Sequence, residues 1–127
     1  MLKIIAGLLV LVGATTVAAC SGAGDDDARS AAQAFVNSLS GPPAGVCAML
    51  SPRAVDALGP SGCGPGTAVA ALPREPVESV SVWGEEAQAH TRGDTLFLHD
   101  FSTGWRITGA GCHPRNEQVY DCSVGGR

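Results

Sequence analysis

The sequence predicts an α+β domain in which N-terminal helices pack on an antiparallel sheet of four to five strands. Between residues 28 and 72, apolar residues recur at helical spacing, and prolines and glycines separate the helical segments. After Pro76, apolar residues alternate with other residues, and short turns follow one another closely, which indicates an antiparallel meander. Helices followed by such a meander are typical of the α+β class.

The N-terminal stretch, residues 1–19, has the pattern of a secretory signal peptide. Lys3 is the only charged residue before Asp25, and residues 4–19 are mostly apolar. This apolar stretch of sixteen residues is shorter than the roughly twenty that a helix needs to cross a bilayer. It ends in Val17-Ala18-Ala19-Cys20, which resembles the lipobox of bacterial lipoproteins.

The lipobox resemblance implies cleavage before Cys20 and attachment of lipid, with palmitate-type acyl chains, to its thiol. Two or more acyl chains anchor a protein stably, whereas one holds it weakly. We therefore expect a lipidated cysteine and tether over residues 20–27 and one domain over residues 28–127, on the outer face of the cell membrane. The alternative is an ordinary signal peptide with an incidental cysteine.

The chain expected after cleavage is acidic and has few aromatic residues. Residues 20–127 contain seven Arg, no Lys and twelve Asp or Glu, which gives a formal charge of −5. This charge argues against nucleic acid or anionic lipid as a partner, since both bind basic patches. The use of Arg without Lys indicates a GC-rich genome, such as that of an actinobacterium. The aromatic residues are Phe35, Trp83, Phe97, Phe101, Trp105 and Tyr120.

The cysteines outside the lipobox predict disulfides. Four remain after Cys20, and an even number in an exported chain favours disulfide pairing. Of the three possible pairings, we prefer Cys47–Cys63 with Cys112–Cys122, because each bond then closes a short loop within its own half of the domain. Zinc sites usually contain closely spaced cysteine pairs, which this sequence lacks, so we expect no metal and no cofactor.

Caps and breaks divide the helical half into short elements. Asp25–Asp27 precede the first helix and suit the positive end of its dipole. Ser51 before Pro52 predicts an N-cap followed by proline at the first helical position, and Thr67 is expected to cap the last helix. The helices are expected over residues 28–39, 44–50, 52–58 and 68–72.

Alternation and turns define the strands of the second half. Arg92-Gly93-Asp94 matches the integrin-binding tripeptide, but we interpret it as a hairpin turn, and we expect a loop over residues 111–117. On the strand after this turn, Leu96, Leu98 and Asp100 share one face, while Phe97, His99 and Phe101 share the other. The strands are expected over residues 77–83, 86–91, 95–102, 105–110 and, as a fifth, 118–124.

The C-terminal stretch Gly104–Cys112, with Tyr120-Asp121-Cys122, resembles a largely uncharacterised group of small actinobacterial lipoproteins. The half that contains Cys47 and Cys63, and the segment Leu96-Phe97-Leu98, fit the same group. The resemblance implies an NTF2-like cone, in which helices pack on a curved sheet. NTF2-like domains serve as enzymes, ligand binders and scaffolds, so this fold alone does not define a function.

The histidines are the obvious candidates for a general base. His90 and His99 lie on neighbouring expected strands, and His113 lies in the expected loop. Because successive strand residues point to opposite faces, His99 and Asp100 form no dyad without a bulge. The sequence also lacks a Gly-x-Ser-x-Gly elbow and a phosphate-binding glycine loop. We therefore expect no catalytic residue.

The sequence therefore predicts a non-enzymatic lipoprotein of the cell envelope that binds a protein partner or a small apolar ligand. The alternative is an NTF2-like hydrolase or isomerase that uses His99 or Asp100. The aromatic residues favour a filled core, and the alternative interpretation is a concave apolar pocket. The residues that would line this pocket are Trp83, Phe97, His99, Trp105 and Tyr120.

Overall fold

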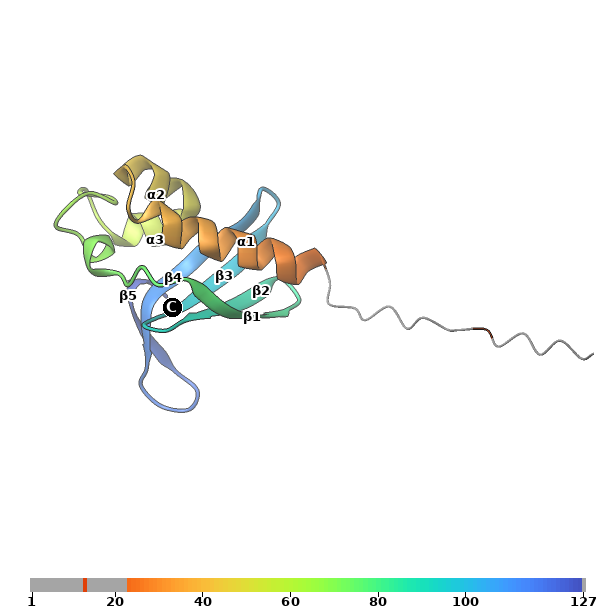
Figure 1. The fold of residues 1–127 in the computed structure, drawn as a ribbon. Coiled ribbons are helices and arrows are strands. Elements are labelled where there is room, and N and C mark those ends of the chain that lie inside the picture. The colour runs from red at the N-terminus through yellow and green to blue at the C-terminus, as the bar shows by residue number, and fades with distance from the viewer. Residues whose placement is uncertain (1–12, 14–22, 127) are drawn as a thin grey trace, which may run out of the picture.

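The computed structural model describes Gly13 and residues 23–126. The expectations about the signal peptide, the lipobox and tether residues 20–22 lie outside these described residues. The described chain confirms the α+β class, with an N-terminal helical part followed by an open antiparallel sheet of five strands. The strand order is β1-β2-β3-β4-β5, so each strand pairs with its neighbours in sequence. Figure 1 shows the helices gathered on one side of this sheet.

The longest helix, α1, spans Ala23–Ser38 and covers the sheet. It begins five residues before the expected start at residue 28, so Asp25 and Asp26 lie in its first turn. Acidic side chains are favourable there because the helix dipole is positive at this end. Within residues 23–126, no helix is long and apolar enough to span a membrane. The buried apolar residues on or just after α1 are Ala28, Ala32, Phe35, Val36 and Leu39.

Two short helices follow, α2 over Pro43–Met49 and α3 over Pro52–Ala57. Each begins with proline, whose missing N–H costs nothing at the first helical position. The Ser51 hydroxyl accepts a hydrogen bond from the backbone N–H of Ala54 at 3.2 Å, which confirms the predicted N-cap of α3. Helices of this length are marginal alone, so packing and cross-links must hold them in place.

A 3-10 helix, η1, spans Ala68–Ala71 and ends the helical part. Thr67 occupies the predicted N-cap position of this helix, but its side chain makes no capping bond, and the hydroxyl instead donates to the Gly64 carbonyl at 2.8 Å. The Cys47–Cys63 disulfide joins α2 to the loop before η1. The buried side chains that this segment adds to the core are Val46, Leu50, Ala54, Cys63, Val69 and Leu72.

The sheet follows the predicted meander, but its fourth strand is longer than expected. The expected loop over residues 111–117 begins later than predicted, because β4 continues to Pro114, and only residues 115–117 of it lie between β4 and β5. Gly111 permits this continuation: its φ is +63°, and a Cβ there would lie 2.0 Å from the Ser123 hydroxyl oxygen. The strands are β1 Val77–Trp83, β2 Glu86–Thr91, β3 Thr95–Phe101, β4 Gly104–Pro114 and β5 Tyr120–Gly125.

Helices cover one face of the sheet and leave the other uncovered. The side chains that point toward the helices form the core, where Phe35 of α1 meets Leu96, Leu98 and Ile107 of the central strands. Helices lie only over this face in Figure 1. The opposite face, which we call the open face, carries the candidate functional residues.

Candidate functional site

The open face is organised in rows of residues that stand opposite one another on neighbouring strands. Directly opposed side chains on antiparallel strands have Cβ atoms about 5 Å apart, so each row brings its members into contact range. The strand register sets three such rows. They are Trp83–Glu86–His99–Arg106, Ser81–Gln88–Phe97 and Ser79–His90–Thr95.

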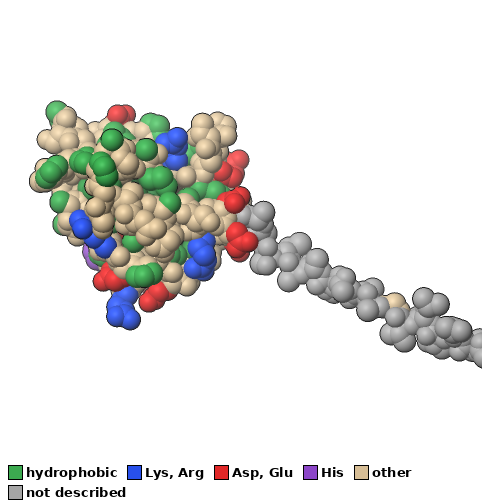
Figure 2. Space-filling model, turned by 45° about the horizontal axis from the view of Figure 1, so that its top comes forward, with side chains coloured by type: hydrophobic (Ala, Val, Ile, Leu, Met, Phe, Trp, Pro, Cys, Tyr) green, Lys and Arg blue, Asp and Glu red, His purple; other side chains and the backbone are tan. Residues whose placement is uncertain are grey.

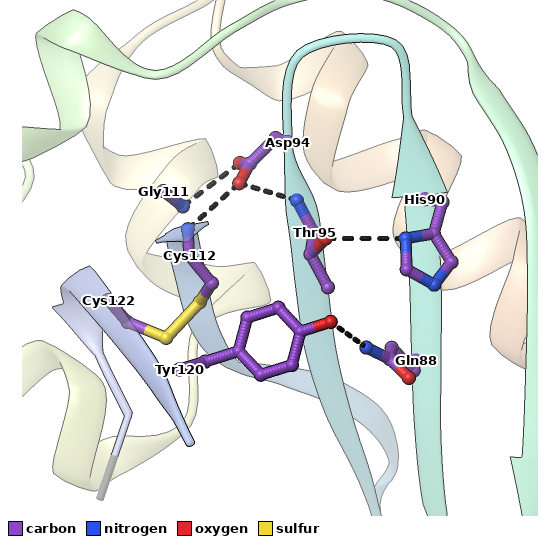
Figure 3. Close-up of a disulfide and its surroundings, with 8 residues drawn as sticks. All are labelled: Gln88, His90, Asp94, Thr95, Gly111, Cys112, Tyr120 and Cys122. Carbon is purple, nitrogen blue, oxygen red and sulfur yellow. Dashed lines mark hydrogen bonds between the residues drawn. A yellow bond between two sulfur atoms is a disulfide. The ribbon is translucent and has the colours of Figure 1, made fainter. Parts of the chain in front are cut away.

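Tyr120 of β5 joins the second row. Its ring meets the Phe97 ring edge to face, with centroids 5.1 Å apart, and its hydroxyl accepts a hydrogen bond from the Gln88 amide at 3.3 Å. In the third row, the Thr95 hydroxyl and His90 Nδ1 are 3.2 Å apart. Figure 3 shows Tyr120 reaching across β3 toward Gln88 on β2. Hydrogen bonds and aromatic contacts therefore order this half of the open face.

His99 is the centre of the first row. Its Nδ1 lies 2.5 Å from Glu86 Oε1, and its Nε2 lies 4.0 Å from Glu85 Oε2. The Phe101 ring packs edge to face on the imidazole at a centroid distance of 4.6 Å. The side chains of His99 and Glu86 are 29% and 52% exposed, so this contact lies at the surface. A carboxylate bonded to Nδ1 orients an imidazole for proton transfer at Nε2.

The contact between His99 and Glu86 was not predicted from the sequence, although the register of the β2–β3 hairpin could have predicted it. Counting outward from the Arg92-Gly93-Asp94 turn pairs His90 with Thr95 and Glu86 with His99, as the structure has them. The same register places His90 and His99 in different rows. His113 is exposed and stands opposite Asp121 on the β4–β5 pair. His99 is therefore separate from the other two histidines, whereas His90 and His113 both line one pocket at the β2–β3 turn.

The structure divides the five residues expected around a pocket between the two faces. Phe97 and Tyr120 are in contact, His99 lies one row away, and Trp83 ends the first row with 53% of its surface exposed. Trp105 instead packs partly buried against the core, two residues before Ile107 and on the same, helix-covered face.

Two pockets of the described chain lie away from these five residues. Each has a volume of about 220 Å³. The first lies between α1, α2 and the Cys63 loop, and includes Leu39, Pro43, Val46, Cys63, Val69 and Arg74. The second lies at the β2–β3 turn, and includes His90, Arg92, Asp94, Thr95, Cys112 and His113.

The residues suited to metals are dispersed. Within residues 23–126, no group of three or more His, Cys, Asp or Glu side chains is placed to hold a metal ion. The four cysteines of this part of the chain form two disulfides, Cys47–Cys63 and Cys112–Cys122. The second disulfide joins directly opposed residues of β4 and β5 and borders the ordered half of the open face (Figure 3).

Asp94 is a buried polar residue that the sequence analysis missed. The Arg92-Gly93-Asp94 segment connects β2 to β3, as predicted for a hairpin turn, but the Asp94 side chain turns inward and is 7% exposed. Its carboxylate accepts hydrogen bonds from the backbone N–H groups of Thr95, Gly111 and Cys112 at 2.7, 2.9 and 2.9 Å. Figure 3 shows how these bonds join the turn to β4. Asp94 is therefore structural and unavailable to an integrin-type partner.

One charged pair lies beyond the end of the open face. The Arg115 guanidinium donates hydrogen bonds to the Asp121 carboxylate across the β4–β5 loop. These bonds, together with the negative charge of Asp121, raise the pKa of Arg115 above its ordinary value. Both side chains are largely exposed, so the pair contributes little to stability.

Comparisons with known proteins add no relative. No protein-family model matches the chain. No curated protein and no solved structure matches it either.

Proposed function

We propose that this chain is a cell-envelope lipoprotein, anchored through Cys20, that binds a protein partner through the open face of its sheet. The proposal depends on one observation: helices cover only one side of the five-stranded sheet, and aromatic side chains line the other. Phe97, Phe101 and Tyr120 are half-buried there, and Trp83 is mostly exposed. Aromatic residues are enriched in protein interfaces and dominate their binding energy.

A protein partner suits this face better than a small apolar ligand. Pockets for drug-sized ligands typically have volumes of about 300–1,000 Å³, whereas the two pockets described above each measure about 220 Å³. The open face also offers Gln88, His90 and Glu86 beside its aromatic rings. Such polar groups give a partner's hydrogen bonds their orientation, while the rings supply apolar contact area.

The proposed anchor sets where the partner is found. Cys20 lies three residues before the first residue of α1, Ala23, so the lipid and the folded domain are close neighbours in sequence. Lipid on Cys20 would hold the domain against the outer face of the cell membrane. The partner is therefore an envelope protein within reach of that surface.

A second candidate function follows from the contact between His99 and Glu86. In an NTF2-like hydrolase or isomerase, Glu86 would orient the His99 imidazole as a general base inside a cone-shaped sheet. Asp100 would not share this role, because it stands opposite Trp105 on the helix-covered face. We prefer the partner proposal because the Glu86 side chain is exposed, the His99 side chain is only partly buried, and neither lines the two pockets described above.

Affinity capture from native membranes tests the partner proposal. The full chain, tagged at its C-terminus, is cross-linked in cells, and co-purified proteins are identified by mass spectrometry. We expect a partner recovered with the wild type and lost with Trp83→Ala and with Tyr120→Ala. Val119→Ala is the matched control, because Val119 is also exposed but lies on the β4–β5 loop. Equal recovery from all four proteins would exclude the open face as the binding surface.

A further inference from the structure

We infer that the first row of the open face, together with Glu85, binds a cationic side chain, arginine or lysine, presented by the protein partner. This inference rests on the proposed function and adds the chemistry of the partner. We call the site the acidic-aromatic row; it consists of Trp83, Glu86 and His99 of the first row, with Glu85 and Phe101 beside them.

The β1–β2 hairpin places an aromatic ring beside carboxylates. Trp83 and Glu86 are the last opposed pair before the turn, and Glu85 lies within that turn. The Trp83 residue is 53% exposed, and the side chains of Glu86 and Glu85 are 52% and 77% exposed. A cation over an indole face is attracted by the ring electrons, and a neighbouring carboxylate adds a charge-assisted hydrogen bond. Arginine and lysine side chains satisfy both contacts.

Within the described chain, the carboxylates of the acidic-aromatic row have no arginine or lysine partner. The only ion-pair contacts of Glu85 and Glu86 among residues 23–126 are with the His99 imidazole. Arg106 stands opposite His99, but its guanidinium donates to the Ala48 carbonyl at 2.8 Å and to the Thr103 hydroxyl at 3.4 Å. Arg106, the arginine of the first row, therefore makes its hydrogen bonds elsewhere. The negative charge of Glu85 and Glu86 faces solvent.

The negative charge at this end of the molecule also favours a cationic protein, rather than the membrane, as the occupant of the acidic-aromatic row. In Figure 1 the β1–β2 turn lies at the end of the sheet where α1 begins. Acidic side chains gather at this start of the described chain in Figure 2, and Asp25 and Asp26 lie in the first turn of α1. Although the proposed lipid on Cys20 would hold this end near the membrane, anionic lipid headgroups make no favourable contact with its carboxylates, whereas a cationic segment is attracted to them.

Peptide binding tests the inference on the full chain, purified from membranes in a neutral detergent. Fluorescence anisotropy measures the affinity of a labelled tetra-arginine peptide and of its neutral citrulline counterpart. We expect only the arginine peptide to bind, with affinity that falls as salt rises. Trp83→Ala and Glu86→Gln should each weaken binding about threefold to fivefold. Asp56→Asn removes an exposed charge from α3 and should leave the affinity unchanged.

Three results would overturn the inference: equal binding of the citrulline peptide, no binding of either peptide, or an Asp56→Asn effect as large as that of Glu86→Gln. Circular dichroism of each variant shows whether it is folded. If Trp83→Ala does not fold, Glu86→Gln alone decides. The capture experiment separates the two proposals. If recovery of the partner is lost with Tyr120→Ala but not with Glu86→Gln or Trp83→Ala, this inference is wrong and the proposed function is still supported.

Discussion

At the scale of single residues, Asp94 is the clearest case of a side chain whose role depends on its partners. Burial of a carboxylate is unfavourable unless hydrogen bonds replace its water. Here three backbone N–H groups do so, one from β3 and two from β4. The Asp94 carboxylate consequently fixes the β2–β3 turn against the strand that carries Cys112.

Asp94→Asn should lower the free energy of unfolding by about 2 kcal/mol. The amide keeps one acceptor oxygen but places an NH₂ group where Oδ2 accepted the Gly111 N–H, so two donors meet in a buried site. Urea unfolding followed by circular dichroism measures the loss. Asp56→Asn on the exposed surface of α3 is the control and should be neutral. A loss equal to that of the control would show that the Asp94 hydrogen bonds contribute nothing to stability.

Ser51 and Thr67 show what residue type alone can predict. Both precede short helices, and the sequence predicts a cap at each. Ser51 is followed by Pro52, which fixes the backbone for a helix start, and its hydroxyl reaches the Ala54 N–H. Thr67 follows a glycine-rich turn that brings the Gly64 carbonyl within hydrogen-bond distance of its hydroxyl. Which backbone group lies nearer depends on turn geometry, and the sequence does not reveal it.

At the scale of elements, the short helices depend on their cross-link. The chain-entropy model gives the Cys47–Cys63 disulfide, with a sequence separation of 16, about 3 kcal/mol of stabilisation. That value matters because α2 and α3 contain only seven and six residues and would not persist alone. The Cys112–Cys122 bond instead cross-links β4 and β5, which the sheet already pairs.

Replacing Cys47 and Cys63 together by alanine should lower the free energy of unfolding by about 3 kcal/mol. It should also loosen the helical segment before the sheet, because the bond ties α2 to the loop that precedes η1. Limited trypsin digestion reports this loosening as faster cleavage after Arg53 of α3. The matched control replaces Cys112 and Cys122 and should accelerate cleavage after Arg115. Unchanged cleavage after Arg53 would contradict the prediction.

The strands were predictable where side chains alternate and less so where they are small. The expected bounds of β1 and β2 match the structure. The alternation of apolar and polar residues disappears in Gly109-Ala110-Gly111, because these small residues do not show which face of a strand is buried. The sequence therefore suggested a loop from residue 111. In the structure β4 stays paired with β5 in one register on both sides of Gly111, whose positive φ suits glycine.

At the scale of the whole molecule, the open face depends on how the strands are registered. Hairpin counting could bring Glu86 opposite His99, since both strands flank one short turn. The same counting from the β3–β4 turn pairs Trp105 with Asp100, because the register shift of β4 against β3 comes only between Phe97 and Leu98, farther from this turn. The expected pocket nevertheless grouped Trp105 with residues of the open face, whereas the structure packs it toward the core.

The proposed anchor makes the last prediction, Cys20→Ser, a test of the whole molecule. Each buried methylene of an acyl chain contributes about 0.8 kcal/mol, and two or more chains are needed for stable attachment. Serine has no thiol to carry this lipid, so the variant should appear in the medium or persist as an uncleaved precursor. Cell fractionation and intact-mass analysis measure both outcomes. Ser21→Ala, which keeps the Cys20 thiol, should remain in the membrane fraction at the lipidated mass. A Cys20→Ser protein that stays membrane-bound at its mature mass would rule out the lipid anchor.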